Sequence, residues 1–195
     1  GDHARVDSRL ESLKELERRL EGFGDGPRAV LTERTTEESG AIGTVADILE
    51  VPRDYEAAVE GALGPRLQWI LVEDRDSGVD NVVYLRNGER GQASFVSFDL
   101  APHPFGERIS GDGLIGPLIP HLAWEGRYDA IVQSLLADVY RVEGLSFGLS
   151  LWEKGGRRHT FVTLAGDVID SNGVIHGGSG GGGGILRKKG EIREL

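Results

Sequence analysis

The last 35 residues of the chain, 161–195, read FVTLAGDVIDSNGVIHGGSGGGGGILRKKGEIREL and contain the features that decide the fold. Alternating hydrophobic and small residues in the first part predict short strands, and the letters DSNG at 170–173 predict a turn between them. An almost pure glycine run follows at 177–184, and 185–195 then return to a charged, helix-favouring pattern. A stretch of backbone almost without side chains therefore separates the predicted strands from the predicted C-terminal helix.

Three explanations of the glycine run remain open from composition alone. It is typical of an engineered flexible linker, or of a loop whose backbone N–H groups cradle a phosphate. Glycine also lacks Cβ, so the run could mark a place where another backbone approaches closely. The spacing G-x-x-x-x-G-K-[ST] of a nucleotide-binding P-loop is absent, because Ile185 follows the run and Lys188 comes too late.

The composition is that of a folded chain. Of 195 residues, 38% are hydrophobic and 28% are charged, which suits one ordinary domain or two small ones. No hydrophobic stretch approaches the roughly 20 residues of a membrane span, and the charged N-terminus does not resemble a signal peptide. Cysteine and methionine are both absent, so disulfides and thiolate metal sites are excluded and we expect an internal fragment of a longer protein. With a net charge of −10, any nucleic-acid contact has to be a local basic patch.

The two ends of the chain resemble each other. Residues 5–23 place hydrophobic side chains at heptad positions: Val6, Leu13, Leu16, Leu20 and Phe23. This pattern predicts a coiled-coil strand, although an ordinary surface helix is also compatible with so short a repeat. Because 185–195 predict a second charged helix, we expect a globular body of about 155 residues that interrupts an antiparallel coiled coil.

The body alternates between strand and helix patterns. Helices are predicted at 53–64, at 77–91 and at the start of 128–144, and strands at 67–74, 93–99 and within 145–178. We interpret 145–178 as strands broken by turns, and the Gly/Pro-rich segment 101–120 as a sub-domain boundary. Alternation of this kind predicts an α/β or α+β fold.

Three segments in order carry a resemblance to a known family: GFGDGPRAVL (22–31), GTVADILEVPRDYEAAVEGALGPRLQWILVED (43–74) and the C-terminal stretch 161–195. Together they resemble the hinge domain of bacterial SMC (structural maintenance of chromosomes) chromosome-partition proteins, with 75–145 the weakest part. The resemblance implies an α+β hinge fold of two sub-domains, with mixed sheets and packed helices. The implied divisions are a coiled-coil segment 1–23, sub-domain 1 at 24–105, sub-domain 2 at 106–184, and the returning coiled coil 185–195.

The resemblance also implies a function. SMC hinges join two coiled-coil arms as a homodimer, and the parent proteins act in chromosome compaction and segregation. The ATP-binding head would lie elsewhere in the parent, so we expect this fragment to be no enzyme and to need no cofactor or metal. Kleisin-type partners would bind the absent heads, and the expected location is cytoplasmic and nucleoid-associated, without a membrane partner.

Four glycines take a role from this resemblance. Carried over by position, the expected dimer contacts are Gly173, Gly177, Gly178 and Gly180. The strand region 168–175 would supply an edge that pairs with the partner's sheet, and two such contacts around a two-fold axis would close a ring.

A basic cluster follows the glycine run. It consists of Arg187, Lys188, Lys189 and Arg193. Such a cluster is either the solvated face of a coiled coil or a phosphate contact. The resemblance favours a weak, sequence-independent DNA contact at the junction of hinge and arm, and we include Lys154, Arg157 and Arg158 as an extension of it.

Two alternative functions remain. One is an α/β nucleotide- or phosphate-binding domain that uses the glycine-rich loop. The other is a hinge of the cohesin or condensin type that prefers a different chain as partner. The five histidines have no metal-ligand spacing and no serine lies in a nucleophile motif, so we assign no catalytic residues.

Overall fold

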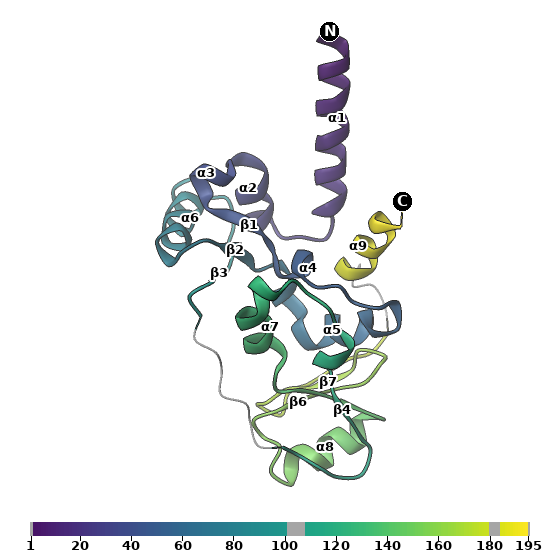
Figure 1. Ribbon diagram of the computed structural model, residues 1–195. Coiled ribbons are helices and arrows are strands. Elements are labelled where there is room, and N and C mark those ends of the chain that lie inside the picture. The colour runs from purple at the N-terminus through teal and green to yellow at the C-terminus, as the bar shows by residue number, and fades with distance from the viewer. Residues whose placement is uncertain (1, 101–107, 180–183, 195) are drawn as a thin grey trace.

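The computed structural model describes residues 2–100, 108–179 and 184–194. Helix α1 (Asp2–Arg19) projects from one end of the molecule, and helix α9 (Ile185–Arg193) lies beside its base (Figure 1). The two chain ends therefore leave the globular body from the same side, as a domain inserted into a coiled coil requires. None of the helices in the described ranges is both long and hydrophobic enough to cross a bilayer.

The first half of the body contains a three-stranded sheet. Its order is β1 (Ala41–Thr44), β2 (Ile70–Val72) and β3 (Phe95–Ser97), with β1 antiparallel and β3 parallel to β2. A parallel pair needs a crossover, which α6 (Arg75–Asn87) supplies. Helices α2 (Asp25–Glu33) and α3 (Thr36–Ser39) pack beside α6 and bury the side of the sheet that carries Ile70 and Val72.

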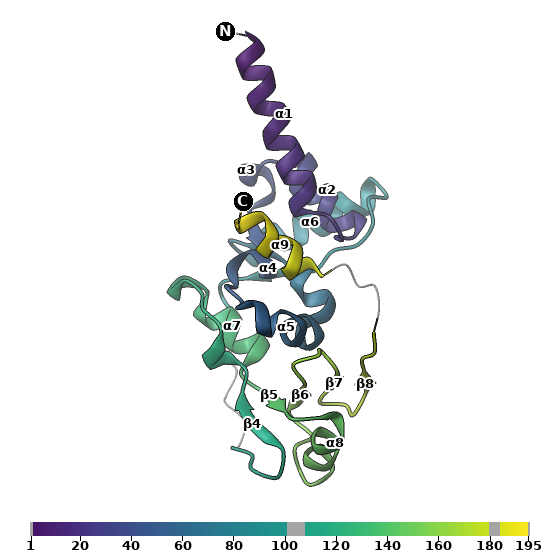
Figure 2. The ribbon, with the colours of Figure 1, turned by 90° about the vertical axis from the view of Figure 1, so that its right-hand side faces the viewer.

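The second half contains a five-stranded sheet. Its order is β4 (Leu114–Pro117), β5 (Val139–Val142), β6 (Thr160–Val162), β7 (Val168–Ile169) and β8 (Ile175–His176). Only β5 and β6 run parallel, and α8 (Leu145–Glu153) forms the crossover between them. Strand β8 is the last strand of this sheet (Figure 2).

The first three strands of the second sheet repeat the first sheet. Each starts with an antiparallel strand whose register shifts after its first pair, between Ala41 and Gly43 in β1 and between Leu114 and Gly116 in β4. The segments ILVEDRDSG (70–78) and YRVEGLSFG (140–148) occupy matching positions, each a strand that runs into its crossover helix. Strands β7 and β8 are therefore an addition to the repeated unit.

One core joins the two halves. Helices α4 (Val45–Ile48), α5 (Glu56–Leu63) and α7 (Asp129–Leu136) lie between the sheets, and α5 contacts both α7 and β6. Four short 3-10 helices of the described chain link these elements: η1 (Arg53–Tyr55), η2 (Gly64–Gln68), η3 (Ile119–His121) and η4 (Gly126–Tyr128). The core includes fully buried side chains from both halves: Val45, Val59, Leu63, Leu118, Ile131 and Leu136. The predicted boundary at 105/106 lies outside the described residues.

The prediction for 145–178 is wrong at its start. Residues 145–153 form helix α8, although Leu145, Phe147, Leu149 and Leu151 alternate like a strand. Leu151 is buried in the small cluster beneath the helix, Leu145 and Leu149 pack against that cluster, and Phe147 is left exposed. The parallel β5–β6 pair requires a long crossover, for which a helix is the usual form, because parallel strands cannot be joined by a tight turn.

Candidate dimerisation edge and arm junction

The region 168–175, expected to supply a sheet edge, forms a hairpin in which β7 is paired on both sides and only β8 lies at the edge. It pairs with β7 on one side, through Val168–His176 and Ile169–Ile175. Val174 and Ile175 are each 58% exposed, which is unusual for large hydrophobic side chains of a sheet. No other described strand lies beyond β8, and an open sheet edge with exposed hydrophobic side chains is suited to pairing with another strand.

The turn that precedes β8 matches its prediction. The Gly173 N–H donates to the Asp170 carbonyl at 2.9 Å, and Asp170 Oδ1 accepts from the N–H groups of Asn172 and Val174 at 2.9 Å each. Gly173 has φ +81°, and a Cβ there would lie 2.7 Å from the Trp152 ring. The turn and the Trp152 packing therefore require this glycine within the monomer.

Gly177 and Gly178 differ in what surrounds them. A Cβ on Gly177 would overlap the Asp167 carboxylate, which accepts the Gly178 N–H at 2.9 Å. Gly178 has φ +118° and nothing within 4 Å of its Cβ position, so its face is open. Gly180, the fourth expected contact, lies outside the described residues.

Where the glycine run ends and α9 begins, the chain contacts the carboxylate of Glu60. The first turn of α9 is capped by Glu60 of α5, whose Oε1 accepts the Leu186 N–H at 2.8 Å. A Cβ on Gly184 would lie 2.9 Å from the same oxygen, so the carboxylate fills the space there. A helix N-terminus is the usual place for a bound phosphate, and here the chain's own anion occupies it. This geometry counts against the phosphate-binding alternative.

The arm junction is built around Asp47 of α4. Its Oδ1 contacts the Lys189 ammonium of α9 and lies 3.4 Å from Arg19 Nη2 of α1. Its Oδ2 accepts from the Thr44 N–H and hydroxyl, both at 2.9 Å, which caps α4. Lys189 is 7% exposed and lies 5.7 Å from the centre of the Phe23 ring. One carboxylate therefore joins α1, α4 and α9.

The charge of Asp47 is set by opposing effects. Burial raises the pKa of Asp47, but the Lys189 charge and hydrogen bond, together with the two bonds from Thr44, outweigh burial and hold its pKa below the ordinary value. The carboxylate is therefore ionised at neutral pH and forms a buried ion pair with Lys189.

The basic cluster is largely occupied by the chain itself. Lys189 differs from the expectation, because its ammonium is buried against Asp47 and does not face solvent. Lys188 Nζ lies 3.0 Å from Glu21 Oε1, and Arg187 Nε lies 3.7 Å from Glu191 Oε1. Arg193 donates to the carbonyls of Leu49 and Asp47 at 3.4 Å. Arg187 and Arg193 remain exposed and Lys188 half-exposed.

The expected extension of this cluster is wrong. Lys154, Arg157 and Arg158 follow α8, which lies at the end of the molecule opposite α1 and α9 (Figure 1). The sequence places them 30 residues before the cluster but gives no distance in space. Sequence reasoning also missed Asp47 and Glu60. The T-x-x-D pattern from Thr44 to Asp47 is a capping-box signal that would have identified Asp47.

Comparison with known proteins identifies the class. The family "SMC proteins Flexible Hinge Domain" matches residues 38–152. The chain is 38% identical over 195 residues to the chromosome partition protein Smc of Myxococcus xanthus and 34% identical over 180 residues to that of Halothermothrix orenii. These alignments cover 96% and 88% of this chain, but only 16% and 15% of the relatives. The chain belongs to the SMC hinge family and spans about one sixth of the relatives' length.

Solved structures agree with this fold. The structure described as an asymmetric dimer of the Geobacillus stearothermophilus SMC hinge domain has a TM-score of 0.81 at 26% identity, and the match covers 98% of this chain and 79% of that chain. The Pyrococcus furiosus SMC hinge domain has a TM-score of 0.64 at 23% identity, with 84% and 88% covered, which supports the fold alone. The predicted α+β hinge fold is confirmed. Within the described ranges, no cluster of three His, Asp or Glu side chains could hold a metal ion.

Proposed function

We propose that this chain is a homodimerisation hinge that joins two SMC arms. The observation that carries the proposal is the β8 edge, where Val174 and Ile175 are exposed and no described strand pairs with the outer side of β8. A second copy of the chain would cover this surface. The hinge of the same fold from Geobacillus stearothermophilus, which was solved as an asymmetric dimer, supports association of two copies.

The internal repeat suggests where β8 binds. Strand β6 has β7 on its outer side, whereas the matching strand β3 has no outer neighbour among the described strands. Strand β8 of one copy would extend the partner's first sheet at β3. A two-fold axis makes two such contacts and closes the ring. The open face of Gly178 lets the partner's backbone approach, and Gly173, Gly177 and Gly180 would shape the loop around the contact.

The arms leave from the other end of each copy. Val6, at a heptad position of α1, is 64% exposed, and Leu10 beside it is 49% exposed, so this outer part of α1 is free to pair with the returning helix. In the parent, these arms would reach an ATPase head and its kleisin-type partner. The dimer would then serve chromosome compaction and segregation in the cytoplasm, at the nucleoid.

A weak DNA contact belongs to the same proposal. Arg187, Lys188 and Arg193 would neutralise phosphates at the arm junction without reading sequence. Lys189 would support this surface through Asp47 and would not touch DNA. Because carboxylates or carbonyls of the chain itself already bind these cations, we expect the DNA contact to be weak. Because the contact neutralises phosphates, we expect its affinity to fall steeply with salt.

Analytical ultracentrifugation at micromolar concentration tests the dimer. The chain should sediment at twice its 21.1 kDa mass. Ile175→Asp should raise the dimer Kd by roughly 100-fold, because the ring buries the new charge twice. Leu164→Asp is the matched control, since Leu164 is 45% exposed but precedes β7 and lies outside the edge strand. A monomeric wild-type chain, or equal effects of the two substitutions, would contradict the proposal.

A further inference from the structure

Two of the three asparagines in the chain precede a glycine, in the pairs Asn87–Gly88 and Asn172–Gly173. Such pairs are chemically reactive, because glycine has no Cβ to hinder its own backbone nitrogen. That nitrogen can attack the side-chain amide carbon of the preceding asparagine and close a five-membered ring. Both asparagines are exposed, so the local backbone and not solvent access decides which of them reacts.

Helix α6 protects Asn87, which is its last residue. The Gly88 N–H donates to the Tyr84 carbonyl at 3.2 Å and closes the final turn of the helix. The attack requires the backbone of Asn87 to leave the helical conformation, which breaks the hydrogen bonds of that turn. The helix therefore keeps the Gly88 nitrogen from its target.

Asn172 lies in the turn between β7 and β8. The Gly173 N–H donates to the Asp170 carbonyl at 2.9 Å, and Asp170 Oδ1 accepts the N–H groups of Asn172 and Val174. The strands on either side have only two residues each, so opening this turn breaks few other bonds. Asn172 is therefore the more reactive of the two asparagines.

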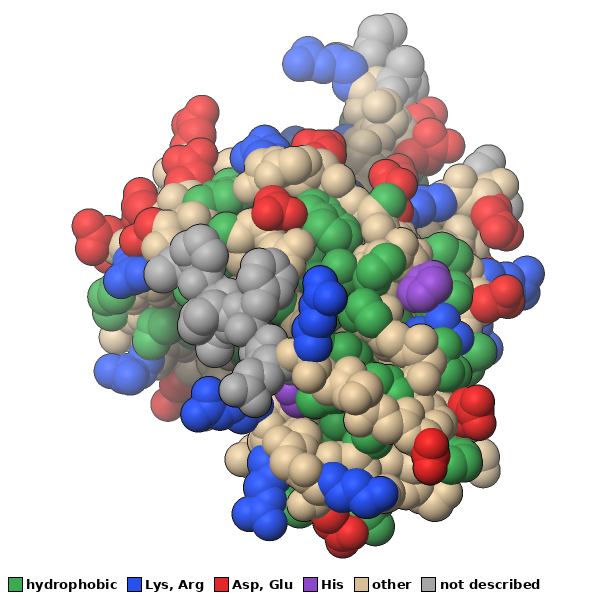
Figure 3. All heavy atoms as spheres, turned by 60° about the horizontal axis from the view of Figure 1, so that its bottom comes forward, with side chains coloured by type: hydrophobic (Ala, Val, Ile, Leu, Met, Phe, Trp, Pro, Cys, Tyr) green, Lys and Arg blue, Asp and Glu red, His purple; other side chains and the backbone are tan. Residues whose placement is uncertain are grey.

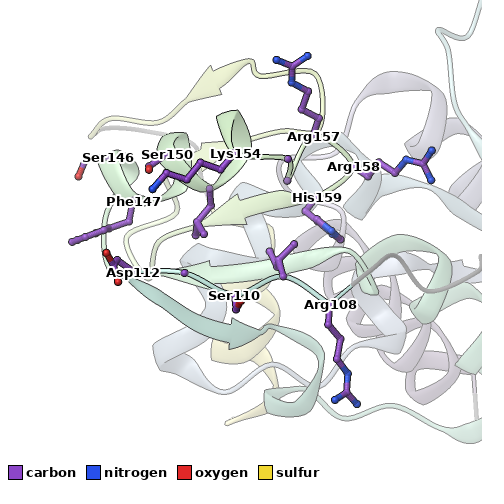
Figure 4. A pocket seen from close by; sticks show the side chains of 15 residues that line it. Arg108, Ser110, Asp112, Ser146, Phe147, Ser150, Lys154, Arg157, Arg158 and His159 are labelled. Atoms are coloured by element: carbon purple, nitrogen blue, oxygen red, sulfur yellow. The ribbon is translucent and has the colours of Figure 1, made fainter.

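One side of the turn is anchored on α8. Trp152 Nε1 donates to the Ser171 carbonyl at 3.2 Å, and the Trp152 ring fills the space beside Gly173. The guanidinium of Arg157 lies over the same ring at 5.2 Å, and Arg157 points away from Asp112 across the groove beside α8 (Figure 4). Strand β8, in contrast, has no described strand on its outer side. A change in the length of the turn is therefore absorbed by β8.

Water reaches the turn from outside. The turn contacts α8, which lies at the end of the molecule opposite the arms (Figure 1). Uncharged polar side chains and backbone cover most of the lower lobe in the space-filling view of this end (Figure 3). Ser171 and Asn172 are both exposed. Hydrolysis of a ring formed at this turn therefore requires no opening of the core.

We propose that Asn172 is a site of spontaneous deamidation, and that its isoaspartate product displaces β8. The Gly173 nitrogen bonds to the side-chain carbon of Asn172, and the amide leaves as ammonia with the proton of that nitrogen. Water then opens the succinimide ring: its hydroxyl bonds to one carbonyl carbon and its hydrogen returns to the Gly173 nitrogen. Opening at the main-chain carbonyl gives isoaspartate, and opening at the side-chain carbonyl gives aspartate.

Isoaspartate changes the hairpin in two ways. The main chain now runs through the side-chain carbon, which adds a methylene between β7 and β8, and a new negative charge lies near Asp170. Because turn length fixes the register of a hairpin, the Val168–His176 and Ile169–Ile175 pairs should weaken. The effect on association rests on the proposed function, in which the β8 edge is the contact, but the deamidation does not.

Peptide mapping by mass spectrometry tests the modification, on the whole chain after incubation at mildly alkaline pH. Deamidation exchanges NH2 for OH, and the peptide with Asn172 should gain the corresponding mass. Asn172 should react at least about 10-fold faster than Asn87, a factor that corresponds to about 1.4 kcal/mol of helix opening. Equal rates, a faster reaction at Asn87, or no reaction at either residue would overturn the proposal.

Two variants test whether the turn controls the reaction. Asp170→Ala removes the two side-chain hydrogen bonds that hold the turn, so Asn172 should react about 5-fold faster in it. Asn172→Gln is the matched control, because glutamine would have to close a larger ring and should keep its amide. An unchanged rate in Asp170→Ala, or an equal rate in Asn172→Gln, would contradict attack by the Gly173 nitrogen in an opened turn.

Hydrogen exchange and sedimentation of the purified isoaspartate form test the displacement of β8. The amides of 174–176 should exchange at least about 10-fold faster than in the fresh chain, and the dimer Kd should rise by at least about 10-fold. Asn172→Asp adds the charge without the methylene and should change each value by less than about 3-fold. Equal values for the two forms would overturn the displacement. A monomeric fresh chain would refute the proposed dimer, whereas exchange and peptide mapping would still decide the present proposal.

Discussion

The two halves of the body use one scaffold for different purposes. Strands β1–β3 and β4–β6 share their order, their directions and the register shift in the first strand. In the first half, the residue three positions after the end of β1 is Asp47, which ties both arm helices to the body. The matching residue after β4 is Pro120, which has no side chain that could do this. The second half instead adds β7 and β8, and with them the exposed edge.

Even the sheet interiors differ at matching positions. Leu71 of β2 is fully buried, while its counterpart on β5 is Arg141, which is 9% exposed and donates to the Tyr55 hydroxyl at 3.0 Å. Tyr55 in turn stacks on His121, with ring centres 4.6 Å apart. The repeat therefore supplies the packing, and the positions where the two halves differ carry the specific contacts. Substitutions at the positions where the two halves differ should therefore show how much arm anchoring, sheet packing and helix capping each contribute to stability.

The largest effect is expected at Asp47. Asp47→Asn removes the counter-charge of buried Lys189, which should lower the free energy of unfolding by about 3 kcal/mol. Arg19→Ala is the control, because Arg19 contacts the same carboxylate from an exposed position and should cost less than about 1 kcal/mol. Urea unfolding measures both. Equal costs would mean that the Lys189 pair does not anchor the arms.

The effect of Asp47→Asn should depend on pH. The folded-state pKa of Asp47 lies below its ordinary value of 3.8, so its charge stabilises the fold fully above that value. The stabilisation is lost as the pH falls through the lowered pKa. The difference between the wild-type chain and Asp47→Asn should thus be constant near neutrality and shrink in acid. A difference that grows in acid would contradict this sign.

The next largest effect compares two glycines at matching helix positions. A Cβ on Gly148 of α8 would lie 3.1 Å from Phe161 Cβ and 3.4 Å from Ile169 Cδ1, whereas one on Gly78 of α6 would lie 3.4 Å from Phe95 Cβ. Alanine gains up to about 1 kcal/mol of helix propensity at either site. Gly78→Ala should therefore stabilise, and Gly148→Ala should destabilise by about 1 kcal/mol, because β7 closes the space above Phe161. Thermal unfolding that gave both variants the same sign would refute the comparison.

The sequence predicts those parts of this fold whose signals are local. The helix pattern at 53–64, ended by glycine, and the hydrophobic strand within 67–74 are both found. Helix α8 was missed because its hydrophobic residues alternate, and the signal for a crossover helix is the parallel pairing of β5 with β6, which is not local. The repeat was missed because short segments such as 70–78 and 140–148 share few identities and match mainly in structure.

The sites are harder to predict because their contacts are long-range. Lys189 reads as an exposed cation in its own helix, and its burial depends on Asp47, 142 residues away in the chain. The glycine run looks like a flexible segment in the sequence, yet a Cβ on Gly177 would overlap the Asp167 carboxylate and one on Gly173 would overlap the Trp152 ring. Local patterns could not predict the edge strand β8, since it has two residues, and the resemblance to the family indicated only the wider region 168–175.

The smallest effect concerns how the two crossover helices begin. Asp74 caps α6, with its Oδ1 accepting the Ser77 N–H at 2.8 Å, whereas the matching residue of α8 is Gly144, which offers no side chain. Gly144 has φ −167°, which any residue adopts, and its Cβ position lies 4.0 Å from the nearest atom, in Phe147. Gly144→Asp should therefore accept a backbone N–H of α8 and raise stability by a few tenths of a kcal/mol. Gly144→Ala adds the same Cβ without the cap, so a thermal midpoint no higher for the aspartate variant than for the alanine variant would show that α8 does not use a cap.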